Sequence, residues 1–238
     1  MIKECIVIGI NSNIKKTETK SIKIGPHSIA AVEQVRNIGV MFDMNMKMST
    51  QISVTCKSTW YNLYSISKIR LYLTHEQTHV TVHAYITSRM DQNNSLIANL
   101  PSSQLGRLQT IQNAAARMIM RAKKYDHVTP LLKELHWLPI EQRPVFKILL
   151  LTFKCLNGVG PEYLKDMLTP YQPGRSLRSS NDSLLCIPKT RLASYGDRSF
   201  SFIAPKYWNN LPHELRCSNS VSVFKKNLKT FLFKQAYA

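Results

Sequence analysis

The feature that most constrains the fold is a change in the spacing of apolar residues near residue 49. Before it, residues 1–46 contain short segments in which apolar and polar residues alternate, as in "KSIKIG" (20–25). A period of two is typical of a β-strand with one buried face. After Ser49 the apolar residues return every three or four positions, which is the period of an amphipathic helix. The sequence therefore predicts a mainly α protein with a small β-containing region at its start.

Three strands are expected in the first region, at "ECIVIGI" (4–10), "KSIKIG" (20–25) and "QVRNIGVMF" (34–42). Polar turn formers separate them, including the pair Gly25-Pro26. We expect each of the three segments to form a single strand.

Three helices are expected next, over about five turns from Ser49, from Thr74 to about Met90, and from Ser103 to Lys124. Thr74 and Gln77 form a T-x-x-Q capping box for the second helix. The apolar faces predict the buried residues, Trp60 included. These are Ile52, Cys56, Trp60, Leu63 and Ser67 on the first helix and Leu105, Leu108, Ile111, Ala115, Met118, Ile119 and Ala122 on the third.

Proline and glycine mark the helices that follow. Thr129-Pro130 predicts an N-cap and a first helical residue. The segment 141–158 predicts a longer helix with Pro144 in its first turn and Gly158 just past its end. Gly160-Pro161 predicts a short helix that ends at Leu168.

The remaining chain is less regular until its last segment. Residues 169–183 are rich in turn formers and predict a linker or loop. Residues 184–216 predict irregular structure with strands at "LLCIP" (184–188) and "SFSFI" (199–203). From Ser220 an amphipathic closing helix is expected, with Phe224, Leu228, Phe231 and Leu232 on one face. The predicted organisation is 1–46, 47–168, the loop 169–183, and 184–238.

The charge of the chain favours anionic partners. Lys and Arg total 32 against 14 Asp and Glu, a formal charge of +18, so nucleic acid is the expected partner. No apolar run is long enough for a membrane span, and we expect an intracellular protein, in nucleus or cytoplasm, rather than a secreted one. The cysteines are widely spaced and predict free thiols.

The stretch "LTHEQTHVTVHAY" (73–85) contains the H-E-x-x-H of zinc proteases. His75 and His79 lie one helical turn apart, as two zinc ligands require. His83 lies about 12 Å from His75 on a straight helix, so it does not reach the same ion. No glycine occurs between Gly39 and Gly106 to turn the chain there. A zinc hydrolase is therefore the least favoured hypothesis, and no metal or cofactor is expected.

Eight blocks resemble one family, the LINE-type (non-LTR) retrotransposon reverse transcriptases, in their order and spacing. They are similar to the carboxy-terminal part of that polyprotein and cover nearly the whole chain. The blocks are "VRNIGVMFD" (35–43), "HAYITSRMD" (83–91), "LQTIQNAAARMIM" (108–120), "HVTPLLKELHWLPIEQR" (127–143), "FKILLLTFKCLNGVGPEYL" (146–164), "RSLRSS" (175–180), "YGDRSFSFIAPKYWNNLP" (195–212) and "FKKNLKTFLF" (224–233).

The resemblance implies part of an RNA-directed DNA polymerase. "VRNIGV" resembles the primer-grip strand at the edge of the palm, the helices after it resemble the thumb, and Met1 is expected just past the active site. The six aspartates include no D-D or D-x-D pair, which two-metal phosphoryl transfer needs. We therefore expect a catalytically incomplete fragment that retains non-specific RNA or DNA binding at most. The alternative is the end of an intact polymerase whose catalytic region lies upstream.

Three groups of cations are candidate nucleic-acid contacts. The first is a predicted row on the third helix, opposite its apolar face: Arg107, Arg117, Arg121 and Lys124. The second includes Lys68 and Arg70, interleaved with Lys57, Trp60, Tyr61, Tyr64 and Tyr72, whose rings stack on bases in other proteins. The third is Arg175 and Arg178 in the predicted loop. A solvated charged face without a ligand is the alternative for each group.

Overall fold

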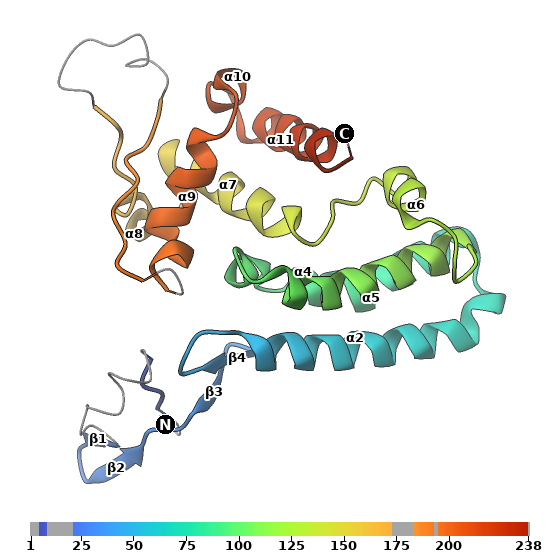
Figure 1. Ribbon diagram of the computed structural model, residues 1–238, viewed down its shortest axis with the longest axis horizontal. Coiled ribbons are helices and arrows are strands. Elements are labelled where there is room, and N and C mark those ends of the chain that lie inside the picture. Colours follow the sequence, from blue (N-terminus) through green and yellow to red (C-terminus); the bar gives the residue numbers. More distant parts are fainter. Residues whose placement is uncertain (1–4, 9–20, 173–182, 193–194, 238) are drawn as a thin grey trace.

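The computed structural model describes residues 5–8, 21–172, 183–192 and 195–237, and these form a mainly helical protein (Figure 1). Strands occur only near the start of the described chain. In chain order the elements are β1 (Ser21–Ile24), β2 (His27–Ala30), β3 (Gln34–Asn37), β4 (Val40–Asp43), α2 (Ser49–Ile69), η1 (Arg70–Tyr72), α3 (His75–Val82), η2 (His83–Thr87), α4 (Ser88–Asp91), η3 (Asn94–Ile97), α5 (Ser102–Met120), α6 (Val128–Glu134), α7 (Gln142–Leu156), α8 (Glu162–Lys165), η5 (Gly196–Arg198), α9 (Phe200–Asn209), α10 (His213–Arg216) and α11 (Val221–Tyr237).

The strands form two antiparallel hairpins, β1–β2 and β3–β4. The single strand predicted over 34–42 is wrong, because the chain turns back at Ile38 and Gly39. Both residues have positive φ, 48° and 80°, as in the two-residue type I′ turn that suits the twist of a hairpin. In the segment 4–10, Cys5 makes an isolated bridge to Ala31, and residues 4, 9 and 10 lie outside the described residues.

Asp43, the last residue of β4, organises the connection into helix α2. The Asp43 carboxylate accepts hydrogen bonds from the backbone N–H groups of Asn45, Lys47 and Met48, at 2.7–3.2 Å. These bonds fix the short connection from β4 into the helix. They place the predicted apolar face of α2 against the rest of the helical core.

The second predicted helix is confirmed in position. Thr74 and Gln77 form the expected capping box at the start of α3. The helical path continues through η2, a π-helical segment, and through α4 to Asp91. The π turn widens the helix by one residue per turn at that point, so it changes which residues after His83 face the core.

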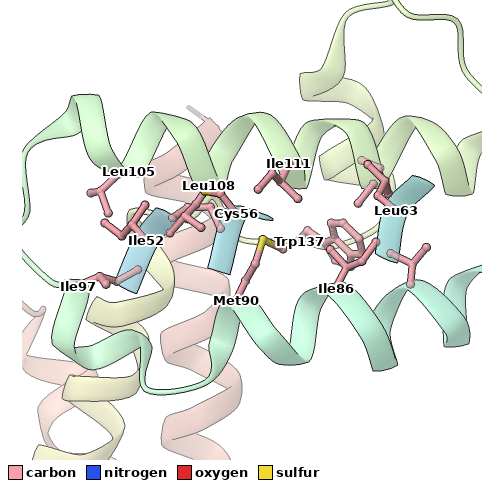
Figure 2. Close-up of a cluster of buried hydrophobic side chains, with 14 of the residues drawn as sticks. Ile52, Cys56, Leu63, Ile86, Met90, Ile97, Leu105, Leu108, Ile111 and Trp137 are labelled. Carbon is pink, nitrogen blue, oxygen red and sulfur yellow. The ribbon is translucent and has the colours of Figure 1, made fainter. Parts of the chain in front are cut away.

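A first hydrophobic cluster lies between α2, the α3–η2–α4 segment and α5 (Figure 2). Its centre is aliphatic, with Ile52, Ile86 and Ile111 each at most 1% exposed. Helix α5 ends at Met120, four residues before the predicted end, because Arg121 adopts a left-handed conformation with φ 55°. Helix α6 begins at Val128 with His127 as its N-cap residue, so the predicted N-cap at Thr129 is wrong.

Helix α7 confirms the roles predicted for Pro144 and Gly158. It begins at Gln142, which puts Pro144 in the first turn, where the missing N–H costs no helical hydrogen bond. It ends before Gly158, whose φ of 72° is the left-handed conformation of a C′ glycine. Past the turn, α8 is shorter than predicted and ends at Lys165.

A second hydrophobic cluster joins α7, α9 and α11. Phe153 stacks on Phe224 with ring centroids 4.2 Å apart, and Trp208 packs against both. The strand predicted at 199–203 is wrong, because these residues lie in η5–α9 and Ile203 is buried on a helix. The closing helix is confirmed as α11, with Phe224, Leu228 and Leu232 buried.

Two hydrogen-bonded side chains connect the clusters. Arg198 donates to the backbone oxygens of Met46 and Leu96, and the Leu96 bond is 2.6 Å long. Tyr237 Oη donates to the backbone oxygen of Trp137 at 2.7 Å. The predicted region 47–168 thus supplies helices to both clusters. None of the described helices combines the length and the apolar character that a bilayer crossing requires.

Candidate nucleic-acid interface

The predicted cationic row on α5 does not form one helical face. Arg107 lies on α5 and donates from Nη1 to Ser53 Oγ on α2 at 3.2 Å. Arg117 donates from Nε and Nη2 to the backbone oxygen of Asp126. Arg121 and Lys124 follow the end of the helix, and Arg121 donates to the backbone oxygen of Leu73. Arg107 therefore joins α5 to α2, while Arg117 and Arg121 bond to the connecting segments that follow α5 and α2.

In the second predicted group, Arg70 bonds to the protein itself, whereas Lys68 is exposed. Arg70 is half-buried and donates from Nε to the backbone oxygen of Met118 at 2.7 Å, which ties the end of α2 to the end of α5. Lys68 is exposed, with its Nζ 4.5 Å from the centroid of the Tyr64 ring. Arg175 and Arg178 lie outside the described residues.

One side of α2 carries both cations and exposed aromatic rings. At 100° per residue, its members fall within an arc of about 100° beside the buried stripe. Trp60 is 43% exposed, Tyr61 71% and Tyr64 62%, so three rings on one helix meet solvent. We call this surface the α2 flank, and its residues are Lys57, Trp60, Tyr61, Tyr64 and Lys68.

The exposure of Trp60 corrects the expectation that it lies in the core. The buried stripe of α2 passes through Thr59 and Ile66 instead of Trp60 and Ser67. Thr59 is fully buried, and its hydroxyl donates to the backbone oxygen of Thr55, so the polar group has a partner inside the core. The indole of Trp60, at the edge of this stripe, meets solvent.

The α2 flank has no acidic partner within the described chain. Arg143 and Asp91 form the single ion pair found among the described residues. Lys57, Lys68 and Arg107 therefore contribute uncompensated positive charge along one side of α2. Because Arg107 bonds to Ser53, which lies on that same side, α5 adds a guanidinium to the surface. Figure 1 shows α2 at the edge of the helical layer.

This arrangement suits an anion that also carries flat rings. Trp60, Tyr64 and Lys68 follow one another at spacings of four residues, about one 5.4 Å turn. Aromatic faces stack on nucleic-acid bases of any sequence, and ammonium groups bind phosphates without reading bases. Tyr72, at the end of the same segment, is 86% exposed.

Three aspartates of the described chain have structural roles. Asp43 accepts three backbone N–H groups, Asp91 pairs with Arg143, and Asp126 accepts the backbone N–H of Lys123 at 2.7 Å. No set of three His, Cys, Asp or Glu side chains in the described part is placed to hold a metal ion. His75 is exposed on α3, while the His79 ring lies 6.4 Å from that of Trp137.

Burial makes the Cys56 and Cys155 thiols less reactive. Desolvation raises the pKa of Cys56, although Arg107 opposes the shift, and desolvation also raises the pKa of Cys155. A raised pKa lowers the fraction of nucleophilic thiolate at neutral pH. These two thiols therefore have the properties of core residues.

Comparison of the chain with family models, curated proteins and solved structures finds no match in any of the three.

Proposed function

We propose that this chain is a catalytically incomplete segment of a LINE-type reverse transcriptase and that it binds RNA and DNA without sequence preference. The observation that carries the binding proposal is the α2 flank, where three exposed rings lie between two lysines that lack acidic partners in the described chain. The sequence blocks that resemble the retrotransposon polymerases support the origin of the segment.

The chemistry of the flank favours single strands. Stacking requires bases whose faces are free, and a duplex keeps its bases paired and stacked inside. Trp60, Tyr61 and Tyr64 are exposed on one helix, and stacking on exposed rings tolerates any base sequence. Lys57, Lys68 and Arg107 supply the phosphate contacts.

The first test removes the rings and keeps the helix. In Tyr61→Ala/Tyr64→Ala, both positions are exposed and alanine has the highest helix propensity, so the fold is expected to persist. Each stack that is removed weakens binding by about 1–3 kcal/mol, so affinity for fluorescent oligo-dT should fall at least tenfold. Fluorescence anisotropy measures this. The matched control is Tyr163→Ala, which removes an exposed ring from α8, away from the α2 flank, and should bind as the wild type does.

A salt titration separates the flank from the predicted α5 row. For a single strand the logarithmic salt slope changes by about 0.7 for each phosphate that the protein no longer neutralises. Lys57→Gln/Lys68→Gln should therefore reduce the slope by about 1.4, whereas Lys226→Gln/Lys234→Gln on α11 should leave it unchanged. A larger reduction in Arg117→Gln/Arg121→Gln than in the lysine variant would place the contact surface on α5 instead.

The catalytic part of the proposal has its own test. We expect no primer extension on poly(A) with oligo-dT in magnesium or manganese, because no aspartate pair provides a two-metal site. Incorporation above that of a heat-inactivated sample would contradict the proposed incompleteness. It would leave the binding proposal to be judged by the flank variants.

A further inference from the structure

A second site candidate lies where the two hydrophobic clusters meet. A cleft of about 520 Å³ is lined by residues of the α3–η2–α4 segment, the loop before α7, and helices α7 and α11. Ligand sites commonly occupy such junctions, with volumes of about 300–1,000 Å³. We call this space the junction cleft. It shares no residue with the α2 flank.

The lining of the junction cleft is strongly basic. Arg143 and Lys147 lie one turn apart on α7, and Lys225 and Lys229 lie one turn apart on α11. One carboxylate, that of Asp91, is among the lining groups, and Arg143 binds it at 2.8 Å. Lys147, Lys225 and Lys229 are exposed and have no ion-pair partner in the described part of the chain. Cations converge on this concave space from two helices.

Arg143 provides a rigid wall for the cleft. Its side chain is 11% exposed, and its Nε donates to the backbone oxygen of Leu138 at 3.0 Å. The guanidinium carbon lies 5.9 Å from the centroid of the Trp137 ring. These contacts hold the guanidinium in place before any ligand arrives, which reduces the entropy cost of binding.

Two buried oxygens on the cleft wall lack partners. Thr87 Oγ1 and Asn94 Oδ1 form no hydrogen bond within the described protein, although both residues are almost fully buried. Buried polar atoms are normally paired, and unpaired ones lower stability. Both residues line the junction cleft. A ligand with a hydroxyl group, such as a protonated phosphate, would supply a donor for one of them.

We propose that the junction cleft binds phosphate groups. Its three exposed lysines match the negative charge, the fixed Arg143 supplies N–H donors, and the unpaired oxygens favour a ligand that also donates. His79, His83 and His136 also line the cleft and add ring nitrogens to its wall. This inference does not depend on nucleic-acid binding at the α2 flank.

The test compares two pairs of lysines on α11. Lys225→Gln/Lys229→Gln removes cleft cations, and Lys226→Gln/Lys234→Gln removes exposed cations of the same helix that do not line the cleft. Calorimetry with pyrophosphate should give binding to wild type that weakens at least tenfold in the first variant and less than twofold in the second. Absence of binding to every anion tested, or equal weakening in both variants, would refute the proposal.

Two arms identify the source of the phosphate. Loss of pyrophosphate binding alone identifies a small ligand, and loss of oligo-dT binding alone identifies a nucleic-acid backbone; either outcome supports the site. Histidine side-chain NMR gives the location, because the ligand should shift the imidazole signals of His79, His83 and His136 and leave that of His75 unchanged. A shift confined to His75 would refute the placement in the cleft.

Discussion

The two hydrophobic clusters reach similar burial by different routes. The first is largely aliphatic, and its main helices follow one another between residues 49 and 120. The second depends on stacked rings, with Phe153 and Phe224 contributed by helices α7 and α11. Contacts between distant segments cost more chain entropy and form more slowly than local ones. The second cluster therefore depends more on a few large side chains, while the first depends on a regular pattern.

The largest effect is expected from Phe224→Ala. Phe224 is fully buried and touches the rings of Phe153 and Trp208, so its removal leaves a cavity and should lower the free energy of unfolding by about 3–5 kcal/mol. Hydrogen exchange should show reduced protection in α7, α9 and α11 before α2 and α5. The neighbouring Val223 is 47% exposed, and Val223→Ala should change stability by less than about 0.5 kcal/mol.

If protection falls equally in all helices, the two clusters unfold as one unit. The comparison between a local and a non-local core would then have no consequence for stability.

The next effect concerns Arg198, which connects the clusters. Burial lowers the pKa of its guanidinium, an effect that Asp43 opposes. Arg198→Met keeps an apolar stem but leaves the carbonyls of Met46 and Leu96 without this donor, which should cost about 2–3 kcal/mol. Urea unfolding measures the cost. A double-mutant cycle with Phe224→Ala should give a coupling of at least about 0.5 kcal/mol, whereas additive effects would contradict a connecting role.

The sequence predicted helices of both clusters, α7 and α11 included, wherever the apolar period or the end signals are local. The helices of the first cluster were predictable because period and caps are local, as at Thr74 and Gln77. The helix α9 was not, because "SFSFI" alternates like a strand. As a helix, this segment buries Ile203 and Trp208 in the second cluster with α7 and α11. Those contacts are distant in sequence, so they override the local strand pattern and cannot be seen in it.

In the candidate sites, too, the sequence predicts what depends on local spacing and misses what depends on contacts between distant segments. The arc of Lys57, Tyr61, Tyr64 and Lys68 could be derived from helical spacing. The exposure of Trp60 could not, because the buried stripe includes the polar Thr59, whose hydroxyl is paired with the helix backbone. Arg121 and Lys124 were expected on α5 but lie beyond its end. The helix stops because Arg121 itself adopts the left-handed conformation, and no glycine marks this stop in the sequence. The junction cleft combines segments up to 150 residues apart, from His79 to Lys229, and no motif could indicate it.

A smaller effect is expected on the pH dependence of stability, because each cluster contains one buried thiol. Burial raises the pKa of both Cys56 and Cys155, so the folded state disfavours their thiolates. The stability that this contributes is fully present below the unfolded thiol pKa of about 8.5 and is lost as pH rises through the folded value. Urea unfolding at rising pH should therefore show a decline that begins above about pH 8.5.

Alkylation assigns that decline to a cluster. Exposed Cys217 should react first, and Cys56 and Cys155 only on opening of the protein. In Phe224→Ala, Cys155 should become reactive while Cys56 stays protected. Equal acceleration at both thiols would agree with a single unfolding unit and contradict the division.

The smallest effect is expected at the turn of the β3–β4 hairpin, where Ile38 has an unfavourable backbone conformation. Ile38 is 87% exposed and has a φ of 48°, a conformation that costs a β-branched residue about 1–2 kcal/mol. Ile38→Asn creates the Asn-Gly pair that type I′ turns prefer, so it should stabilise the β3–β4 hairpin by about 1 kcal/mol. Ile38→Ala is the matched control, because it removes the exposed side chain without the left-handed preference of asparagine. A thermal melt that ranks asparagine above alanine assigns the gain to the turn; equal gains would assign it to removal of the side chain. Because Val40 on β4 is buried in the first cluster, slower exchange should extend to the start of α2 and leave α7 and α11 unchanged.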